Sequence, residues 1–124
     1  MIGQLSGRVM FVSDGVATVF THGVGYEVHC NVEPDSMVNL WTHEHAPQDA
    51  PHELYGFKEI ADRDLFRRLL KVKGVGPKVG MRIVAAKGIN RDGIPFPVTL
   101  ASVRGVGSKL IAAIMEEFND NGSG

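Results

Sequence analysis

The sequence predicts a protein of two parts, an all-β segment followed by an all-α segment. In residues 1–57 apolar and polar residues alternate between glycine-containing turns, as in short strands. After Phe57 the apolar residues recur at the three- and four-residue spacing of helices, and a short Gly-Val-Gly pattern occurs twice. The chain has 124 residues, 44% of them apolar, which suffices for one or two small cores but not for a large enzyme domain.

The first part predicts a small barrel. Turn residues at Ser13-Asp14-Gly15 and from His22 to Gly25 separate runs of strand-forming residues. The expected strands are residues 2–12, 16–21, 26–31, 37–42 and 53–57. Five short strands with glycines at the bends are typical of a Greek-key barrel of the OB type, which we expect over residues 1–60.

The second part predicts short helices. Leu65, Phe66 and the Leu69-Leu70 pair indicate a helix from Asp62 that ends at Gly74. Pro77 suits the start of the next helix, and Gly80 would let a partner helix approach closely. A loop over residues 87–97 precedes a short helix at 98–103 and a last helix at 108–118. We therefore expect a helical domain over residues 61–118 and a disordered tail over residues 119–124.

A repeat within the helical part is the most informative feature. Residues 69–79 superpose on residues 100–110 after a shift of 31 positions, matching Leu, Val, a basic residue, Gly-Val-Gly, Lys and an aliphatic residue. The glycines permit a positive φ and a close approach of the backbone to another surface. The amides of the turn and of the following helix N-terminus favour an anion, and a lysine follows each turn. This helix-hairpin-helix pattern predicts a grip on nucleic-acid phosphates; the alternative is an ordinary glycine C-cap.

The charge is divided along the chain. The net charge is −1 overall, but −6 over residues 1–57 and +8 over residues 58–115, where both Gly-Val-Gly turns lie. Such asymmetry indicates two parts with opposite electrostatic roles. Additional DNA contacts are expected from the basic residues Lys73, Arg82 and Arg104, and Lys71 is a further candidate; the alternative for each is a solvated surface.

Other features narrow the class of protein. Cys30 is the single cysteine, so no intrachain disulfide can form and a reducing compartment fits. The apolar run at residues 9–12 is too short for a signal peptide or a membrane span, which predicts a soluble cytoplasmic protein with no membrane partner. His43, His45 and His52 lack the companions of a metal-ligand set, so we expect no metal and no cofactor.

Over residues 1–118 the chain resembles the RuvA family, the Holliday-junction-binding proteins of branch migration. The resemblance rests on MIGQLSG at residues 1–7, GVGYEV at 23–28, LYGF at 54–57, Leu65-Phe66, and GVGPK at 74–78. It implies an OB barrel followed by two helix-hairpin-helix motifs. It also implies a homotetramer without catalytic residues that holds a four-way DNA junction open in recombination and repair, driven by a RuvB-type ATPase.

The resemblance also assigns residues. It implies phosphate binding by the backbone around one set of positions: Gly74, Val75, Gly76, Lys78, Gly105, Val106, Gly107 and Lys109. The family carries an acidic pin between the last two barrel strands, for which Asp49 is the candidate here, with Glu44 and Glu53 nearby and Gln48 in place of a second acid. The family's third domain, which recruits the ATPase, has no counterpart in this sequence, so we expect no docking of the motor by that route.

Two other function classes remain open. Some helix-hairpin-helix proteins are nucleases or glycosylases, but the basic half holds no acid cluster with metal-site spacing. The chain could also be a general duplex or single-strand DNA-binding or interaction module without junction preference. Single-strand binders display aromatic residues for base stacking, and most of the barrel aromatics are expected in the core: Phe11, Phe20, Tyr26, Trp41, Tyr55 and Phe57.

Overall fold

The structure, a computed structural model, describes the backbone of residues 2–122 and the side chains of residues 2–119. The chain divides into two compact units, Met1–Arg63 and Asp64–Gly124, each described here by itself. The division falls three residues after the expected domain boundary at residue 60. No helix within residues 2–122 has both the length and the apolar character needed to cross a membrane.

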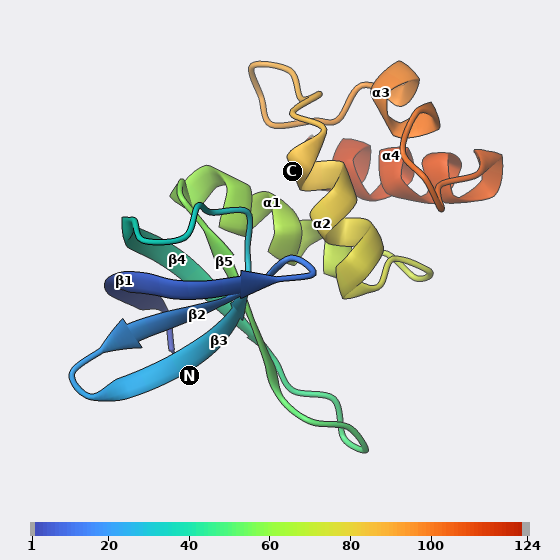
Figure 1. The fold of residues 1–124 in the computed structure, drawn as a ribbon. Coiled ribbons are helices and arrows are strands. Elements are labelled where there is room, and N and C mark those ends of the chain that lie inside the picture. The colour runs from blue at the N-terminus through green and yellow to red at the C-terminus, as the bar shows by residue number, and fades with distance from the viewer. Residues whose placement is uncertain (1, 123–124) are drawn as a thin grey trace. The chain divides into compact units, whose positions relative to one another are not determined.

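The first unit is a closed barrel with strand order β1-β2-β3-β5-β4, in which β4 returns to pair with β1 (Figure 1). Only the β3–β5 pair is parallel. The strands are β1 Gln4–Ser13, β2 Val16–Thr21, β3 Val24–His29, β4 Met37–His45 and β5 Glu53–Phe57. This is the order of an OB barrel, so the predicted fold class is confirmed.

Two tight turns and one bulge shape the barrel. Asp14-Gly15 and His22-Gly23 both have positive φ at each residue, the geometry of two-residue hairpin turns that follow the strand twist. The register of β1 against β2 shifts between Val9 and Phe11, which marks a β-bulge. The bulge interrupts the inward–outward alternation. Met10 and Phe11 are therefore 54% and 62% exposed.

The expectation that the barrel aromatics lie mostly in the core is thus wrong for part of the set. Phe11 and Phe20 are exposed on β1 and β2, whereas Tyr55 and Phe57 on β5 are buried. The barrel core is instead built from aliphatic side chains, with Val9, Val19, Val28 and Leu40 fully buried.

The second unit holds the helices that follow the barrel. They are α1 Ile60–Leu70, which begins before the division between the units, then α2 Pro77–Ala85, α3 Pro97–Ala101 and α4 Ser108–Gly122 (Figure 1). Phe66, Leu69, Leu100, Ile114 and Phe118 form its core, each no more than 1% exposed.

The last helix is longer than expected. The sequence predicts an end near Phe118 and a disordered tail from Asn119, but α4 continues to Gly122. No glycine or proline interrupts residues 108–121, so nothing in the sequence breaks the helix before Gly122. Ser123 and Gly124, the remainder of the expected tail, lie outside the described residues.

The two halves of the helical unit pack reciprocally. A Cβ built at Gly74 would lie 3.2 Å from Cδ1 of Leu110, and one built at Gly105 would lie 3.3 Å from Cγ2 of Val79. The shift of 31 positions relates Gly74 to Gly105 and Val79 to Leu110. The sequence repeat is therefore also a structural repeat, in which the hairpin of each copy contacts the second helix of the other.

Candidate nucleic-acid interface

Each Gly-Val-Gly turn joins two helices, and its first glycine is required by the backbone. The φ angles of Gly74 and Gly105 are +100° and +92°, a region that side chains of L residues disfavour. Both residues are exposed. The first glycine of each turn therefore reverses the chain between the helices α1 and α2 and between α3 and α4.

The second glycine has no such requirement. Gly76 has φ −92° and ψ 174°, which any residue adopts, and Gly107 also lies outside the positive-φ region. A Cβ at either position would meet no atom within 4 Å. Both positions are exposed. Nothing in the described chain calls for glycine at these two positions, so a group outside the chain is the remaining reason for a missing side chain there.

The two turns expose unpaired backbone donors. Among the described residues, the N–H groups of Gly74 and Gly76 donate to no acceptor, and the same holds for Gly105 and Gly107. The first hydrogen bond of α2 runs from Gly80 N–H to the carbonyl of Gly76, which leaves the N–H of Lys78 free as well. Each hairpin thus presents a set of N–H groups at a helix N-terminus, an arrangement that suits an anion.

The middle residue of each turn does not fit the expected role. The N–H of Val75 donates to the carbonyl of Val72 at 3.1 Å, and the N–H of Val106 donates to that of Val103 at 3.2 Å. Both valine side chains are buried, at 7% and 9% exposure. Val75 and Val106 therefore close the turns and anchor them in the core, and their amides are not available to a phosphate.

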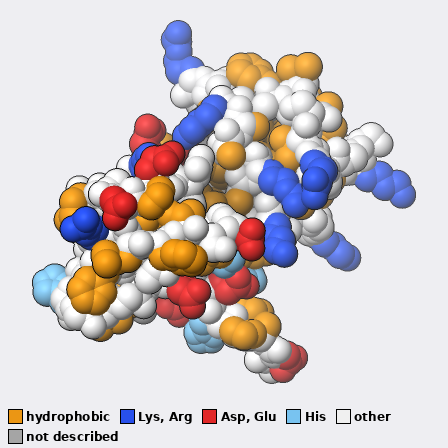
Figure 2. Space-filling model, in the orientation of Figure 1, with side chains coloured by type: hydrophobic (Ala, Val, Ile, Leu, Met, Phe, Trp, Pro, Cys, Tyr) orange, Lys and Arg blue, Asp and Glu red, His pale blue; other side chains and the backbone are white. Residues whose placement is uncertain are grey.

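Positive charge accompanies the free donors. Lys78 and Lys109 are exposed in the first turns of α2 and α4, and neither first turn contains an acidic residue. Lys73 and Arg104, which precede the turns, are also exposed, and no described residue forms an ion pair with any of these four. On the face drawn in Figure 2, Lys and Arg side chains gather over the helical unit, whereas Asp and Glu dominate the barrel.

Among the basic residues expected to contact DNA, Arg82 makes a hydrogen bond within the protein. Nη1 of Arg82, near the end of α2, donates to the backbone carbonyl of Arg104 at 3.3 Å. Spacing alone could not predict this bond, because it joins the two copies of the repeat across 22 residues.

The acidic candidates lie on the β4–β5 hairpin, which extends from the barrel (Figure 1). Asp49 is exposed in the loop at the end of this hairpin. Glu44 pairs with His52, with 3.5 Å between Oε2 and Nδ1, and Glu53 pairs with His29, with 2.7 Å between Oε2 and Nε2. The structure therefore separates one free carboxylate at the tip from two that pair with histidines along the hairpin.

Tyr55 is the buried centre of this hairpin. Its ring stacks on His29 with 4.6 Å between centroids. Burial raises the pKa of Tyr55 to about 12, with smaller contributions from the charge of Glu53 and from a hydrogen bond to it. Tyr55 is therefore protonated at neutral pH and links the histidine–carboxylate pair to the barrel.

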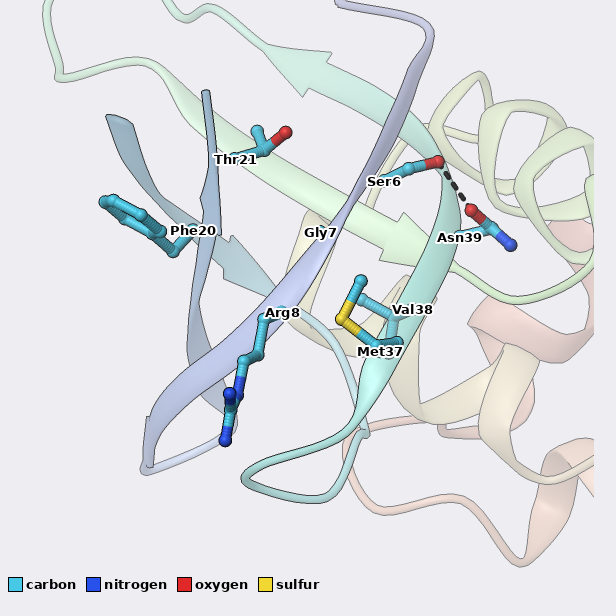
Figure 3. A pocket seen from close by; sticks show the side chains of 8 residues that line it. All are labelled: Ser6, Gly7, Arg8, Phe20, Thr21, Met37, Val38 and Asn39. Carbon is cyan, nitrogen blue, oxygen red and sulfur yellow. Dashed lines mark hydrogen bonds between the residues drawn. The ribbon is translucent and has the colours of Figure 1, made fainter. Parts of the chain in front are cut away.

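The barrel also carries a shallow pocket between β1, β2 and β4 (Figure 3). Its side chains include Phe20 and Met37, and a hydrogen bond from the Ser6 hydroxyl to Oδ1 of Asn39 lies at one side. Arg8 is the one charged residue in its lining. Neither a carboxylate pair nor a histidine lines it, so it offers no acid–base chemistry. Within residues 2–119, no three His, Cys, Asp or Glu side chains are grouped to hold a metal ion.

Comparisons with known proteins agree with both units. Residues 1–56 match the family described as RuvA N terminal domain, and residues 66–91 match the SAM-like helix-hairpin-helix tandem. Relatives named Holliday junction branch migration complex subunit RuvA include one from Acinetobacter baumannii, 35% identical over 97% of this chain and 65% of its own length. The relative from Syntrophobacter fumaroxidans is 34% identical over 97% of this chain and 66% of its own length.

A third relative of the same name, from a Psychrobacter species, is 42% identical over 68% of this chain and 43% of its own length. The chain therefore spans about 65% of the length of the first of these relatives. The barrel order, the paired hairpins and the extent of these matches agree with one another. The chain belongs to the RuvA family.

Proposed function

We propose that this protein binds four-way DNA junctions by their phosphates, without reading the base sequence, and holds them open for branch migration. The observation that carries the proposal is that neither Gly76 nor Gly107 needs to be glycine for the fold of the protein. Both are exposed glycines with ordinary backbone angles and open space around Cα. Their missing side chains make sense when a DNA backbone approaches closely enough to accept hydrogen bonds from the turn.

The donors at these turns are suited to phosphate. Backbone N–H groups and helix N-termini contact phosphate oxygens and carry no base specificity. Lys78 and Lys109 supply fixed positive charge beside the free N–H groups of Gly74, Gly76, Gly105 and Gly107. A protein that must allow the junction to move along DNA needs this indifference to sequence.

The junction preference and the assembly complete the proposal. The relatives' name, a branch migration complex subunit, supports the four-way junction as the ligand and a non-catalytic role. We propose a homotetramer, in which two hairpins from each chain grip the four arms, and a RuvB-type ATPase as the motor. The solution mass of the protein with and without a synthetic junction tests the assembly.

Fluorescence anisotropy tests the function itself. A labelled four-way junction is compared with a linear duplex of the same arm sequence, a junction of unrelated sequence, and a single strand. The proposal expects preference for both junctions over the duplex, and affinity that falls steeply with salt as counterions are released. Equal affinity for junction and duplex would remove the junction preference. Tightest binding to the single strand would favour the exposed Phe11 and Phe20 of the barrel as a base-stacking surface.

Two variants identify the surface. Gly76→Val and Gly107→Val place a branched side chain where the protein has open space, so both should fold normally and lose DNA affinity. Gly3→Val is the matched control, because Gly3 is an exposed barrel glycine without a positive φ and with no atom near its Cβ position. If Gly3→Val weakened binding as much as the hairpin variants, the hairpins would not be the site.

A further inference from the structure

The two copies of the repeat differ at one position that contacts a hairpin. By the shift of 31 residues, Arg82 of α2 and Ala113 of α4 occupy equivalent positions in the two copies. The guanidinium of Arg82 donates to the carbonyl of Arg104, which leads into the second hairpin. Ala113 has no side-chain donor, so the first hairpin has no equivalent contact from the second copy.

The Arg104 carbonyl that Arg82 contacts belongs to the same peptide group as the Gly105 N–H, one of the candidate donors to phosphate. The Arg104–Gly105 peptide is trans, since the described residues contain no cis peptide bond. In a planar trans peptide the C=O and the N–H point in opposite directions. Holding the Arg104 carbonyl toward Arg82 therefore directs the Gly105 N–H away from Arg82, and that N–H makes no bond within the described chain.

This peptide needs an external restraint. Gly105 has φ +92° and no side chain, so rotation of the peptide next to it meets little steric resistance. In the native orientation this peptide presents an N–H to a phosphate. If the peptide rotated, it would present a carbonyl oxygen instead, and that oxygen would repel the phosphate. A charged donor holds a carbonyl more strongly than a neutral one. Arg82 is also close to this glycine, with 3.4 Å between Nη1 and a Cβ built at Gly105.

We propose that Arg82 is a positioning residue of the second hairpin, which fixes the direction of the Gly105 N–H, and is not itself a phosphate ligand. The proposal rests on the proposed function and revises the sequence-based expectation of a direct DNA contact at Arg82. It also makes the two hairpins unequal: the second is preorganised by the first copy, whereas the Lys73–Gly74 peptide has no such tether.

The first experiment needs no DNA. Residual dipolar couplings report the orientation of each backbone N–H in the free protein, in the wild type and in Arg82→Ala. The proposal expects a changed coupling at Gly105 in the variant, with Gly74 unchanged as the internal control. An unchanged coupling at Gly105 would overturn it. Because this measurement involves no ligand, its outcome is independent of whether the protein binds junctions.

The second experiment is a double-mutant cycle on junction affinity. Arg82→Ala should weaken binding about tenfold, the effect of a lost charge-assisted hydrogen bond. In a Gly107→Val background, where the second hairpin is already blocked, it should cause no further loss. In a Gly76→Val background the full loss should remain. Arg91→Ala, an exposed arginine in the loop before α3, is the matched control.

A direct phosphate contact gives a different result. Arg82→Ala would then weaken binding equally in both backgrounds and would reduce the slope of log affinity against log salt by about 0.9. Either observation would overturn the positioning role. Absence of junction binding by the wild type itself would overturn the proposed function, while the dipolar couplings would still decide the role of Arg82.

Discussion

Gly80 packs directly against the ring of Phe66: a Cβ built on this glycine would lie 3.1 Å from Cε1 and 3.3 Å from Cδ1. Phe66 on α1 is fully buried and Gly80 on α2 is buried as well. The ring therefore has little freedom to move aside, and the two helices approach as closely as they do because position 80 lacks a side chain. The sequence-based expectation for Gly80 is confirmed.

This contact predicts a specific loss of stability. Gly80→Val should lower the free energy of unfolding by about 2 kcal/mol, because an overpacked core forces backbone shifts. Urea unfolding followed by circular dichroism measures it. Ala112→Val, at an exposed position of α4, controls for the helix propensity of valine. Equal losses for the two variants would show that the contact with Phe66 is not the cause.

The two glycines of each hairpin should separate stability from binding. Gly74→Ala and Gly105→Ala should each cost about 1–2 kcal/mol of stability, because alanine is strained at positive φ. Gly76→Ala and Gly107→Ala should leave the thermal unfolding midpoint nearly unchanged and weaken DNA binding. Thermal denaturation and anisotropy on the same samples measure both effects. A large fall in the midpoint for Gly76→Ala would contradict the division of roles.

The single cysteine predicts a dependence of stability on alkaline pH. Cys30 is 4% exposed, and burial raises the pKa of its thiol from 9.0 to about 11. Well below pH 9 the thiol is protonated in both states and contributes no pH dependence. As the pH rises from about 9 to about 11, the unfolded chain loses this proton first, so the stability of the folded protein falls.

Comparison with Cys30→Ala isolates this contribution from the other groups that titrate in the same range. The difference in unfolding free energy between wild type and variant should shrink as the pH rises from 8 to about 11. Iodoacetamide should also react with the native protein far more slowly than with the unfolded one. A difference in unfolding free energy that is constant with pH would show that the thiol titrates alike in both states.

The exposed carboxylate at the hairpin tip predicts an effect on DNA geometry. If Asp49 repels phosphates near the centre of a bound junction, Asp49→Asn should alter the angles between the arms more than the affinity. Energy transfer between dyes on two arms measures those angles. Asp14→Asn, in the turn between β1 and β2, is the control acid of the same barrel. Identical transfer efficiencies for wild type and Asp49→Asn would exclude a pin role for Asp49.

Much of the fold could be predicted from local signals. The Asp14-Gly15 and His22-Gly23 turns mark the strand boundaries, and Pro77 marks the start of α2. The exposure of Phe11 could not be predicted, because it follows from a bulge that the strand pairing creates. The end of α4 was also missed, since polar residues 119–121 are typical of a tail but contain nothing that stops a helix.

The sequence locates the two hairpins of the candidate site but not the hydrogen bonds within them. The repeated pattern locates both hairpins, but it does not show which backbone N–H groups are already hydrogen-bonded within the turn. Val75 and Val106 use theirs in hydrogen bonds three residues back, a choice made by the local turn geometry. The bond from Arg82 to Arg104 depends on how the two copies pack, which no spacing within one copy encodes.

The exchange of contacts between the two halves of the helical unit has a consequence for its stability. The side chain of Leu110 packs against Gly74, and that of Val79 packs against Gly105. Such an exchange of equivalent contacts is found in interfaces with two-fold symmetry. A lone helix-turn-helix peptide would leave its half-buried aliphatic side chain, Val79 or Leu110, without this contact. The two copies therefore complete each other's packing, so neither copy is expected to be stable without the other.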